Sequence, residues 1–95
     1  MPLFISDKIR QKLTQKHGVN EEDIIQCFAS REKGFLEDTR EDHKTNPPTR
    51  WFIAETDFGR KLKIVFMLYP DTGEIHIKTA YEPNLKEIAI YERYA

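Results

Sequence analysis

The sequence predicts an α+β fold made of two N-terminal helices, an antiparallel meander of about four strands and a C-terminal helix. Two observations lead to this prediction. Apolar residues recur at helical spacing in residues 6–30, whereas residues 50–80 form short apolar runs separated by turn residues. A further helix-start signal, after those at Ser6 and Asn20, follows at Asn84. Residues 1–95 are enough for one modest core, so we expect a single domain.

The first helix is expected to begin after Ser6, whose side chain can cap the free amide groups of a first turn. Ile9 and Leu13 are four residues apart and therefore share one helical face. Gly18 can adopt the left-handed conformation that ends many helices.

A second helix is expected directly afterwards, in the stretch KHGVNEEDI at residues 16–24. Asn20 and Asp23 have the spacing of a capping box, and Val19 and Ile24 have the spacing of a hydrophobic staple. The acidic residues of this stretch then belong to the first turn, where the helix dipole favours negative charge. The stretch is thus interpreted as one helix end followed by one helix start.

The middle of the chain is predicted to form the sheet. Residues 61–69 are apolar at nearly every position, so we expect them at the centre of the sheet. The other expected elements are a short edge strand at 34–38, a loop at 39–49, a strand at 50–56, a turn at 57–59, a turn at 70–73 and a strand at 74–80. In the last strand, alternation places Ile75, Ile77 and Thr79 on one face and Glu74, His76, Lys78 and Ala80 on the other.

The C-terminal helix is expected to start at Asn84, because Glu87 follows at the spacing of a capping box. Leu85, Ile88 and Tyr91 are predicted to share its buried face. We expect the helices to cover one face of the sheet, which leaves the other face or an open rim as the working surface.

Composition limits the cellular setting and the partners. The chain has 15 basic and 16 acidic residues and a formal net charge of -1, so bulk charge does not indicate nucleic-acid binding. Cys27 is the only cysteine and cannot form an internal disulfide, and no secretory signal is recognised, so we expect a cytoplasmic protein. The most apolar run, residues 64–69, is too short to cross a bilayer.

Several motifs are better explained by structure than by chemistry. Residues 57–59 spell the Asp-Phe-Gly of protein kinases, but without the other kinase motifs they are interpreted as a hairpin turn. His17, His43 and His76 are too scattered for a zinc site, and we expect neither a metal nor a cofactor. Cys27 is expected to be an inert core residue.

The two N-terminal helices could also resemble a helix-turn-helix DNA reader. The second helix begins with three acidic residues, Glu21, Glu22 and Asp23. Because these would repel phosphates, we do not favour DNA recognition.

A positively charged cluster on the predicted meander is the strongest functional signal. If its members share a face, they could hold a phosphodiester; otherwise they are ordinary solvent-exposed residues that protect the sheet. RNA cleavage without a metal needs a base for the 2′-hydroxyl, a proton donor for the leaving oxygen and cations for the transition state. The cluster consists of Arg50, Arg60, Lys61, Lys63, His76 and Lys78, with Tyr81 just after the last strand.

Four stretches that cover nearly the whole chain share one family pattern: KHGVNEEDIIQCF, LEDTRED, WFIAETDFGRKLKIVF and IHIKTAYEPNLKEIAIYE. Together they resemble the BrnT-like toxins of the RelE superfamily. The resemblance implies a small metal-independent ribonuclease that acts on messenger RNA and is neutralised by a ribbon-helix-helix antitoxin. The resemblance is that of a divergent member, because Tyr81 stands where this family usually has an arginine, and Thr49 precedes Arg50 where a glutamate is common.

Within this hypothesis, Arg60 and Lys78 stabilise the charge of the transition state, and His76 or Tyr81 exchanges protons. The remaining roles are RNA binding by Arg50, Lys61 and Lys63, with Glu41 and His43 as second-choice bases.

The alternative hypothesis is a non-catalytic interaction domain that keeps the toxin fold and its partner groove. The exposed edge of the meander favours association, so we expect an antitoxin complex or a homodimer in the cell.

Overall fold

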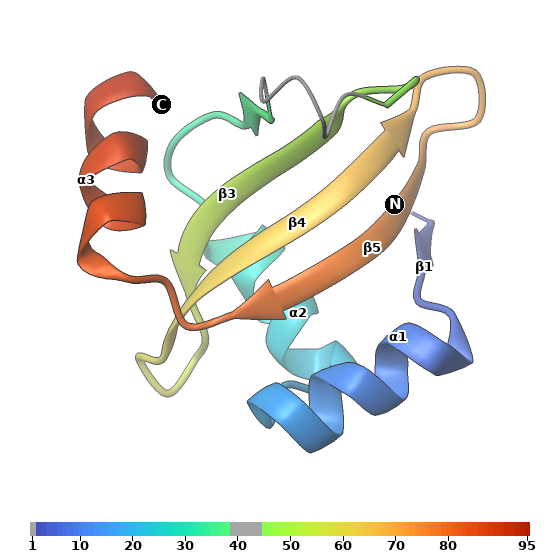
Figure 1. Cartoon of the computed structure of the whole chain (residues 1–95), viewed down its shortest axis with the longest axis horizontal. Helices are drawn as coiled ribbons and strands as arrows, with labels where there is room; N and C mark the ends of the chain where they lie inside the picture. The colour runs from blue at the N-terminus through green and yellow to red at the C-terminus, as the bar shows by residue number, and fades with distance from the viewer. Residues whose placement is uncertain (1, 39–44) are drawn as a thin grey trace.

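The computed structural model describes residues 2–38 and 45–95 and confirms the α+β class. Its five-stranded sheet has the order β1-β5-β4-β3-β2, which puts β4 at the centre as predicted (Figure 1). The elements are β1 (Leu3–Phe4), α1 (Asp7–Lys12), η1 (Leu13–His17), α2 (Glu21–Ser30), β2 (Leu36–Glu37), β3 (Thr49–Glu55), β4 (Lys61–Tyr69), β5 (Glu74–Tyr81) and α3 (Leu85–Tyr94).

The helix boundaries lie where the local signals predicted them. The Ser6 side chain accepts a hydrogen bond from the Ile9 amide, and the wider π-helical turn η1 ends at Gly18, whose φ is 61°. Asn20 and Asp23 form both hydrogen bonds of a capping box at the start of α2. The stretch 16–24 is therefore a helix end followed by a helix start.

The strand β1 was not predicted. It has only two residues, too few for a periodic pattern, and it runs parallel to β5 with Leu3 opposite Ile75 and Phe4 opposite His76. It makes the sheet five-stranded rather than four-stranded. The consequence is that the N-terminal segment protects the edge of β5 and brings an aromatic side chain to it.

The predicted alternation of β5 is wrong beyond residue 77. Thr79 pairs with Val65 and Ile77 pairs with Phe66, so Lys78 is an extra residue in a β-bulge. One extra residue inverts the facing of all residues that follow it. Ala80 is accordingly buried in the core, whereas Thr79 leaves the face that it was predicted to share with Ile77.

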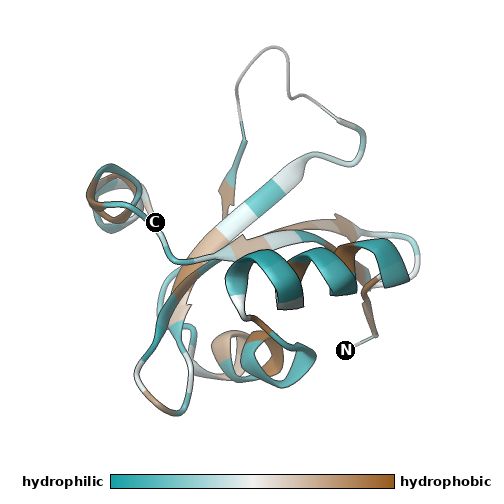
Figure 2. Ribbon diagram, turned by 60° about the horizontal axis from the view of Figure 1, so that its bottom comes forward, coloured by the Kyte–Doolittle hydropathy of each residue, from teal (hydrophilic) through white to brown (hydrophobic). Residues whose placement is uncertain are grey.

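The helices also do not cover a single face of the sheet. α2 packs on one face, and α3 lies on the other side of the sheet, over the β3 end (Figure 2). Leu85 is 86% exposed rather than buried. Tyr91 anchors the helix instead, because its ring lies 5.7 Å from that of Trp51 and its hydroxyl donates to the Gly34 carbonyl.

The core lies between the sheet and the N-terminal helices. Phe52 and Phe66 are fully buried, and Ile24 and Cys27 of α2 pack among them, as expected for the apolar stripe of that helix. Burial raises the pKa of the Cys27 thiol to about 12, so the thiol is neutral and inert at physiological pH. Within the described part of the chain, no helix is long and apolar enough to cross a membrane.

The turn at residues 57–59 is the hairpin turn predicted from the sequence, with Phe58 93% exposed and Gly59 at a φ of 80°. The predicted loop 39–49 ends one residue early, because Thr49 already pairs with Met67 in the sheet. Residues 39–44 lie outside the described residues.

Candidate functional site

The sheet face opposite α2, called here the open face, presents side chains from three neighbouring strands. Lys63 of β4 pairs with Tyr81 of β5, and Val65 pairs with both Trp51 of β3 and Thr79 of β5. Directly paired residues point to the same side of a sheet, so these five side chains form one surface. The bulge at residue 78 is what turns Thr79 and Tyr81 toward it.

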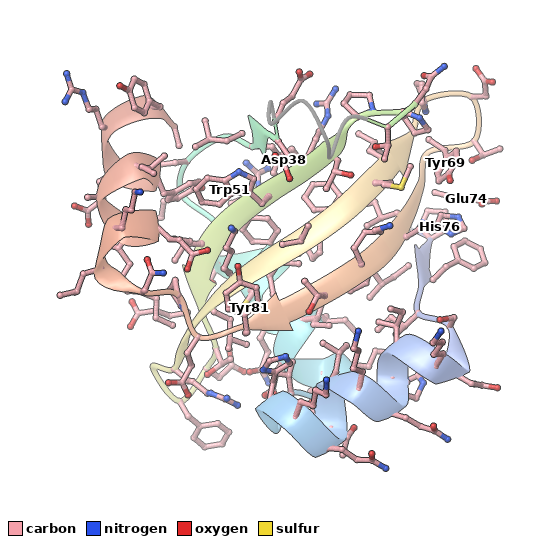
Figure 3. All side chains as sticks on the ribbon, viewed as in Figure 1. Asp38, Trp51, Tyr69, Glu74, His76 and Tyr81 are labelled. Atoms are coloured by element: carbon pink, nitrogen blue, oxygen red, sulfur yellow. The ribbon has the colours of Figure 1, made fainter. Side chains whose placement is uncertain are left out.

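α3 covers one end of the open face and turns this surface into a groove of about 730 Å³. The floor is formed by Trp51, Lys63 and Tyr81, and the wall is formed by Glu87 and Ile90 of α3. Figure 3 shows Trp51 and Tyr81 at this end of the sheet. The groove is large enough for a small ligand or part of a chain.

Three polar groups converge on one carboxylate in this groove. The Tyr81 hydroxyl and the Lys63 ammonium each donate a hydrogen bond of 2.7 Å to Oε2 of Glu87. The other oxygen, Oε1, accepts the Asn84 amide at 3.0 Å as part of the capping box of α3. The cap therefore fixes the orientation of the carboxylate that holds Lys63 and Tyr81.

These contacts shift the pKa values of both acids. Partial burial alone would raise the pKa of Glu87, but the hydrogen bonds from Lys63, Asn84 and Tyr81 together with the Lys63 charge lower it below 4.5. Burial and the bond to Glu87 raise the pKa of Tyr81 above 10, against the opposing effect of Lys63. At neutral pH the site thus holds an ionised carboxylate beside a protonated phenol.

Aromatic rings hold the Lys63 side chain in place. Its Nζ lies 4.4 Å from the ring centre of Trp51 and 5.6 Å from that of Tyr81, within the range of cation–π attraction. The side chain is only 14% exposed. A partly desolvated ammonium exerts a stronger field on a bound anion than one in water does.

We expect Glu87→Gln to weaken the dependence of stability on acid pH. The folded-state pKa of Glu87 is lowered, so the stabilisation from its ionised form is fully present above the ordinary pKa of 4.5 and is lost as pH falls through the lowered value. Glutamine keeps the helix cap but cannot ionise.

Thermal unfolding followed by circular dichroism between pH ~3 and ~7 tests this expectation. The melting temperatures of wild type and Glu87→Gln should converge as the pH is lowered. The control is Glu92→Gln, which changes an exposed glutamate of the same helix. An unchanged gap between wild type and Glu87→Gln across this range would contradict the linkage.

Arg60, predicted to stabilise a transition state, is used by the fold instead. Its guanidinium donates to the carbonyl oxygens of Gly18 at 2.8 Å and His17 at 2.6 Å, and to the Glu82 carboxylate at 2.9 Å. The two carbonyls end η1, where the helix dipole favours a cation. Arg60 therefore joins the end of η1 to the segment that follows β5.

We expect Arg60→Ala to lower the free energy of unfolding by about 2 kcal/mol, because charged hydrogen bonds to two carbonyl groups are lost. Arg60→Lys should restore little of this loss, since an ammonium cannot reproduce the planar fork of donors. Chemical denaturation measures both changes. The surface pair of Arg10 and Glu21 supplies the control, and Arg10→Ala should cost less than ~1 kcal/mol. Equal losses in Arg60→Ala and Arg10→Ala would refute the structural role.

His76 and Lys78 lie away from the groove. His76 stands near the start of β5, with Tyr69 and Glu74 beside it and apart from Trp51 and Tyr81 (Figure 3). It precedes Tyr81 by five positions on one strand, which is a distance of ~16 Å. Lys78 is the exposed residue of the bulge. His76 and Tyr81 thus cannot act on the same phosphate.

The other predicted residues are also dispersed. Arg50 is 3.8 Å from Glu37 of the edge strand, in an exposed ion pair. Lys61 is exposed at the start of β4, opposite Glu55 and two positions before Lys63, but it does not line the groove. Only Lys63 and Tyr81 of the predicted set meet in the groove. The second-choice bases Glu41 and His43 lie outside the described residues.

Two groove residues were missed as functional candidates. Glu87 was assigned only to the helix cap, because a cap at this spacing explains a glutamate fully. Trp51 was assigned only to a strand. The available signal was the sheet register, which places Lys63 beside Tyr81 and Trp51 one strand away. This register depends on the bulge at Lys78, so it cannot be predicted from the alternation of residues alone.

Comparisons with known proteins do not extend the resemblance. No protein-family model matches the chain, and no curated protein matches it at a significant level. Across residues 2–38 and 45–95, no three histidine, cysteine or acidic side chains form a group that could hold a metal ion. The functional argument therefore depends on the groove and its chemistry.

Proposed function

We propose that this protein is a cytoplasmic, metal-independent RNA endonuclease of the BrnT-like toxin type, which acts on messenger RNA in the groove beneath α3. One observation supports the reaction above all others: Lys63 and Tyr81 both bond to the same oxygen of Glu87 in an open groove. A cation, a proton donor and a carboxylate are the groups that 2′-hydroxyl attack on a phosphodiester needs.

Each group takes one role. Glu87 accepts the proton of the 2′-hydroxyl, whose oxygen then bonds to phosphorus. The bond from phosphorus to the 5′-oxygen breaks, and Tyr81 gives its proton to that leaving oxygen. Lys63 stabilises the negative charge of the transition state. The products are a 2′,3′-cyclic phosphate and a 5′-hydroxyl.

The same hydrogen bond restores the site after the reaction. Cleavage leaves Glu87 protonated and Tyr81 as a phenolate, and the two oxygens are 2.7 Å apart in the free protein. The proton can therefore return directly from the carboxyl group to the phenolate, because the carboxyl is by far the stronger acid. No metal or cofactor takes part in any of these steps.

Incubation of the purified protein with varied RNAs, with and without ribosomes, tests this function. We expect fragments that end in 2′,3′-cyclic phosphate, no change when a chelator is added, and no cleavage at a 2′-deoxy position. Expression without the gene neighbour should slow growth. RNA that stays intact under all these conditions, together with normal growth, would refute the proposal.

A second candidate is an interaction domain, favoured by the apolar part of the same groove. Leu36, Val65, Ile90 and Tyr94 line it beside the polar trio, and Leu36 belongs to the edge strand β2. Such a surface suits a partner segment or a second copy of the chain. We propose a ribbon-helix-helix antitoxin as the partner and a homodimer as the alternative.

Co-expression with the neighbouring gene followed by affinity purification and light scattering distinguishes these assemblies. A stable complex with a small protein supports the antitoxin, and a concentration-independent dimer of the chain alone supports self-association. A strict monomer that recovers no specific protein would exclude both.

A further inference from the structure

A second aromatic cluster lies on the sheet away from the groove. The rings of Phe4 and His76 are stacked, with centroids 5.0 Å apart and an angle of only 16° between their planes. Tyr69 meets the His76 ring edge-on at 4.7 Å, and the Glu74 carboxylate is 3.0 Å from Nε2 of His76. The cluster is held by the register of β1, β4 and β5, since Phe4 pairs with His76.

This cluster is partly exposed to solvent and does not belong to the core. Phe4 is 45% exposed and the His76 side chain is 41% exposed, although both belong to strands that are locked in the sheet. Tyr69 approaches His76 from another side, so the stack is covered on one side by Tyr69 while nearly half of Phe4 remains open. A flat, rigid and accessible ring of this kind is the platform on which proteins stack unpaired bases.

The cluster is aligned with the groove along β5. Pairing of His76 with Met67 and of Tyr81 with Lys63 places both sites on the open face, ~16 Å apart. Val65 and its partner Thr79 lie between them on the same face, so one continuous surface joins the two sites.

We propose that the Phe4–His76 stack is a second RNA subsite, which binds an unpaired base of the same strand whose phosphodiester lies in the groove. A stacked strand advances ~3.4 Å per nucleotide, so the two sites are separated by up to about five nucleotides. The substrate is therefore a single-stranded segment, because a base in a duplex cannot leave its partner to stack on the ring without an additional cost. This inference rests on the proposed function, because it takes the groove to hold the phosphodiester of the same RNA strand.

Binding of 2′-O-methylated oligonucleotides tests the subsite, because the blocked 2′-oxygen prevents cleavage during the measurement. We expect Phe4→Leu to weaken binding of an eight-nucleotide strand by about 5- to 100-fold, the effect of losing one stacked base. Binding of a dinucleotide, which cannot span both sites, should be unchanged. Phe58→Leu is the control, since Phe58 is even more exposed than Phe4 (93% against 45%), has no ring partner among the described residues and lies in the β3–β4 turn.

A second variant keeps the result interpretable if Phe4→Leu disturbs β1. Phe4→Trp preserves the flat ring, so it should retain tight binding of the long strand. Its additional indole fluorescence, relative to wild type, should be quenched by the eight-nucleotide strand and not by the dinucleotide.

The outcomes separate the two proposals. Equal affinity of Phe4→Leu and Phe58→Leu for the long strand, with no quenching in Phe4→Trp, overturns the subsite even if the wild type cleaves RNA. Binding that depends on Phe4 without any cleavage supports the subsite and rejects the nuclease. A protein that binds none of these strands has neither property.

Discussion

Tyr81→Phe is expected to reduce the rate of RNA cleavage by about 10²- to 10⁴-fold, the range for losing a general acid. The change removes one oxygen atom, which in the wild type donates to Glu87 at 2.7 Å. The ring and its contact with Lys63 remain. The loss should therefore appear in the turnover rate with little change in the affinity for RNA.

Tyr69→Phe is the control for this experiment, because it removes the same atom from a tyrosine at the other end of the sheet face and keeps the ring that packs against His76 (Figure 3). Single-turnover cleavage of one RNA by the three proteins gives the comparison. Thermal melts should show that both variants fold. If Tyr81→Phe cleaves as fast as Tyr69→Phe, the proton donor is another group and the roles assigned to the trio are wrong.

Lys63→Met is expected to lower the cleavage rate by about 100-fold or more, as for the loss of one donor that stabilises transition-state charge. Methionine fills much of the same volume but supplies no cation. Because the Lys63–Glu87 pair is largely screened from water, this variant should also lose stability. Rates must therefore be compared at a temperature where circular dichroism shows full folding.

Two further variants separate charge from folding. Lys61→Met removes the same charge two positions away on β4, where the side chain is exposed, and should leave cleavage nearly unchanged. Lys63→Arg keeps the charge and should restore part of the activity. A fully folded Lys63→Met that cleaves at the wild-type rate would exclude Lys63 from the reaction.

The parts of the fold that were predictable are those specified by neighbouring residues. Ser6, Gly18 and Asn20 act within one helical turn, so their side chains and backbone preferences were sufficient to place the ends of the N-terminal helices. The central position of β4 was predicted from its apolar run and is confirmed, although only one of its faces is buried: Leu62, Ile64 and Phe66 lie in the core, whereas Lys63, Val65 and Met67 are half-buried on the open face.

The errors come from interactions between distant segments. The two-residue strand β1 exists only because β5 offers it an edge, and the bulge at Lys78 depends on the pairing of β5 with β4. The position of α3 depends on Tyr91 reaching Gly34 and Trp51. None of these partners is close in sequence, so periodicity could not reveal them.

The residue types of the candidate site were predictable from the sequence, but their arrangement was not. Lys63 and Tyr81 were selected by residue type, which is a property of the sequence. Their proximity and the exclusion of His76 required the register of the sheet, and the exclusion of Arg60 required its contacts with His17, Gly18 and Glu82. Glu87 was hidden because one of its oxygens serves the cap, and nothing in the sequence shows that the other is available.

The extra residue at position 78 makes β5 tolerant of a change in chain length at this one point. Ile77 lies opposite Phe66 and Thr79 lies opposite Val65, so a chain without Lys78 could pair regularly with no shift of either half of the strand. Ala80 would stay in the core, and Tyr81 would stay opposite Lys63 and beside Glu87. A deletion of one codon at Lys78 could thus remove the bulge while the site is kept. In an alignment of related chains, a gap at this position would therefore not indicate loss of the site.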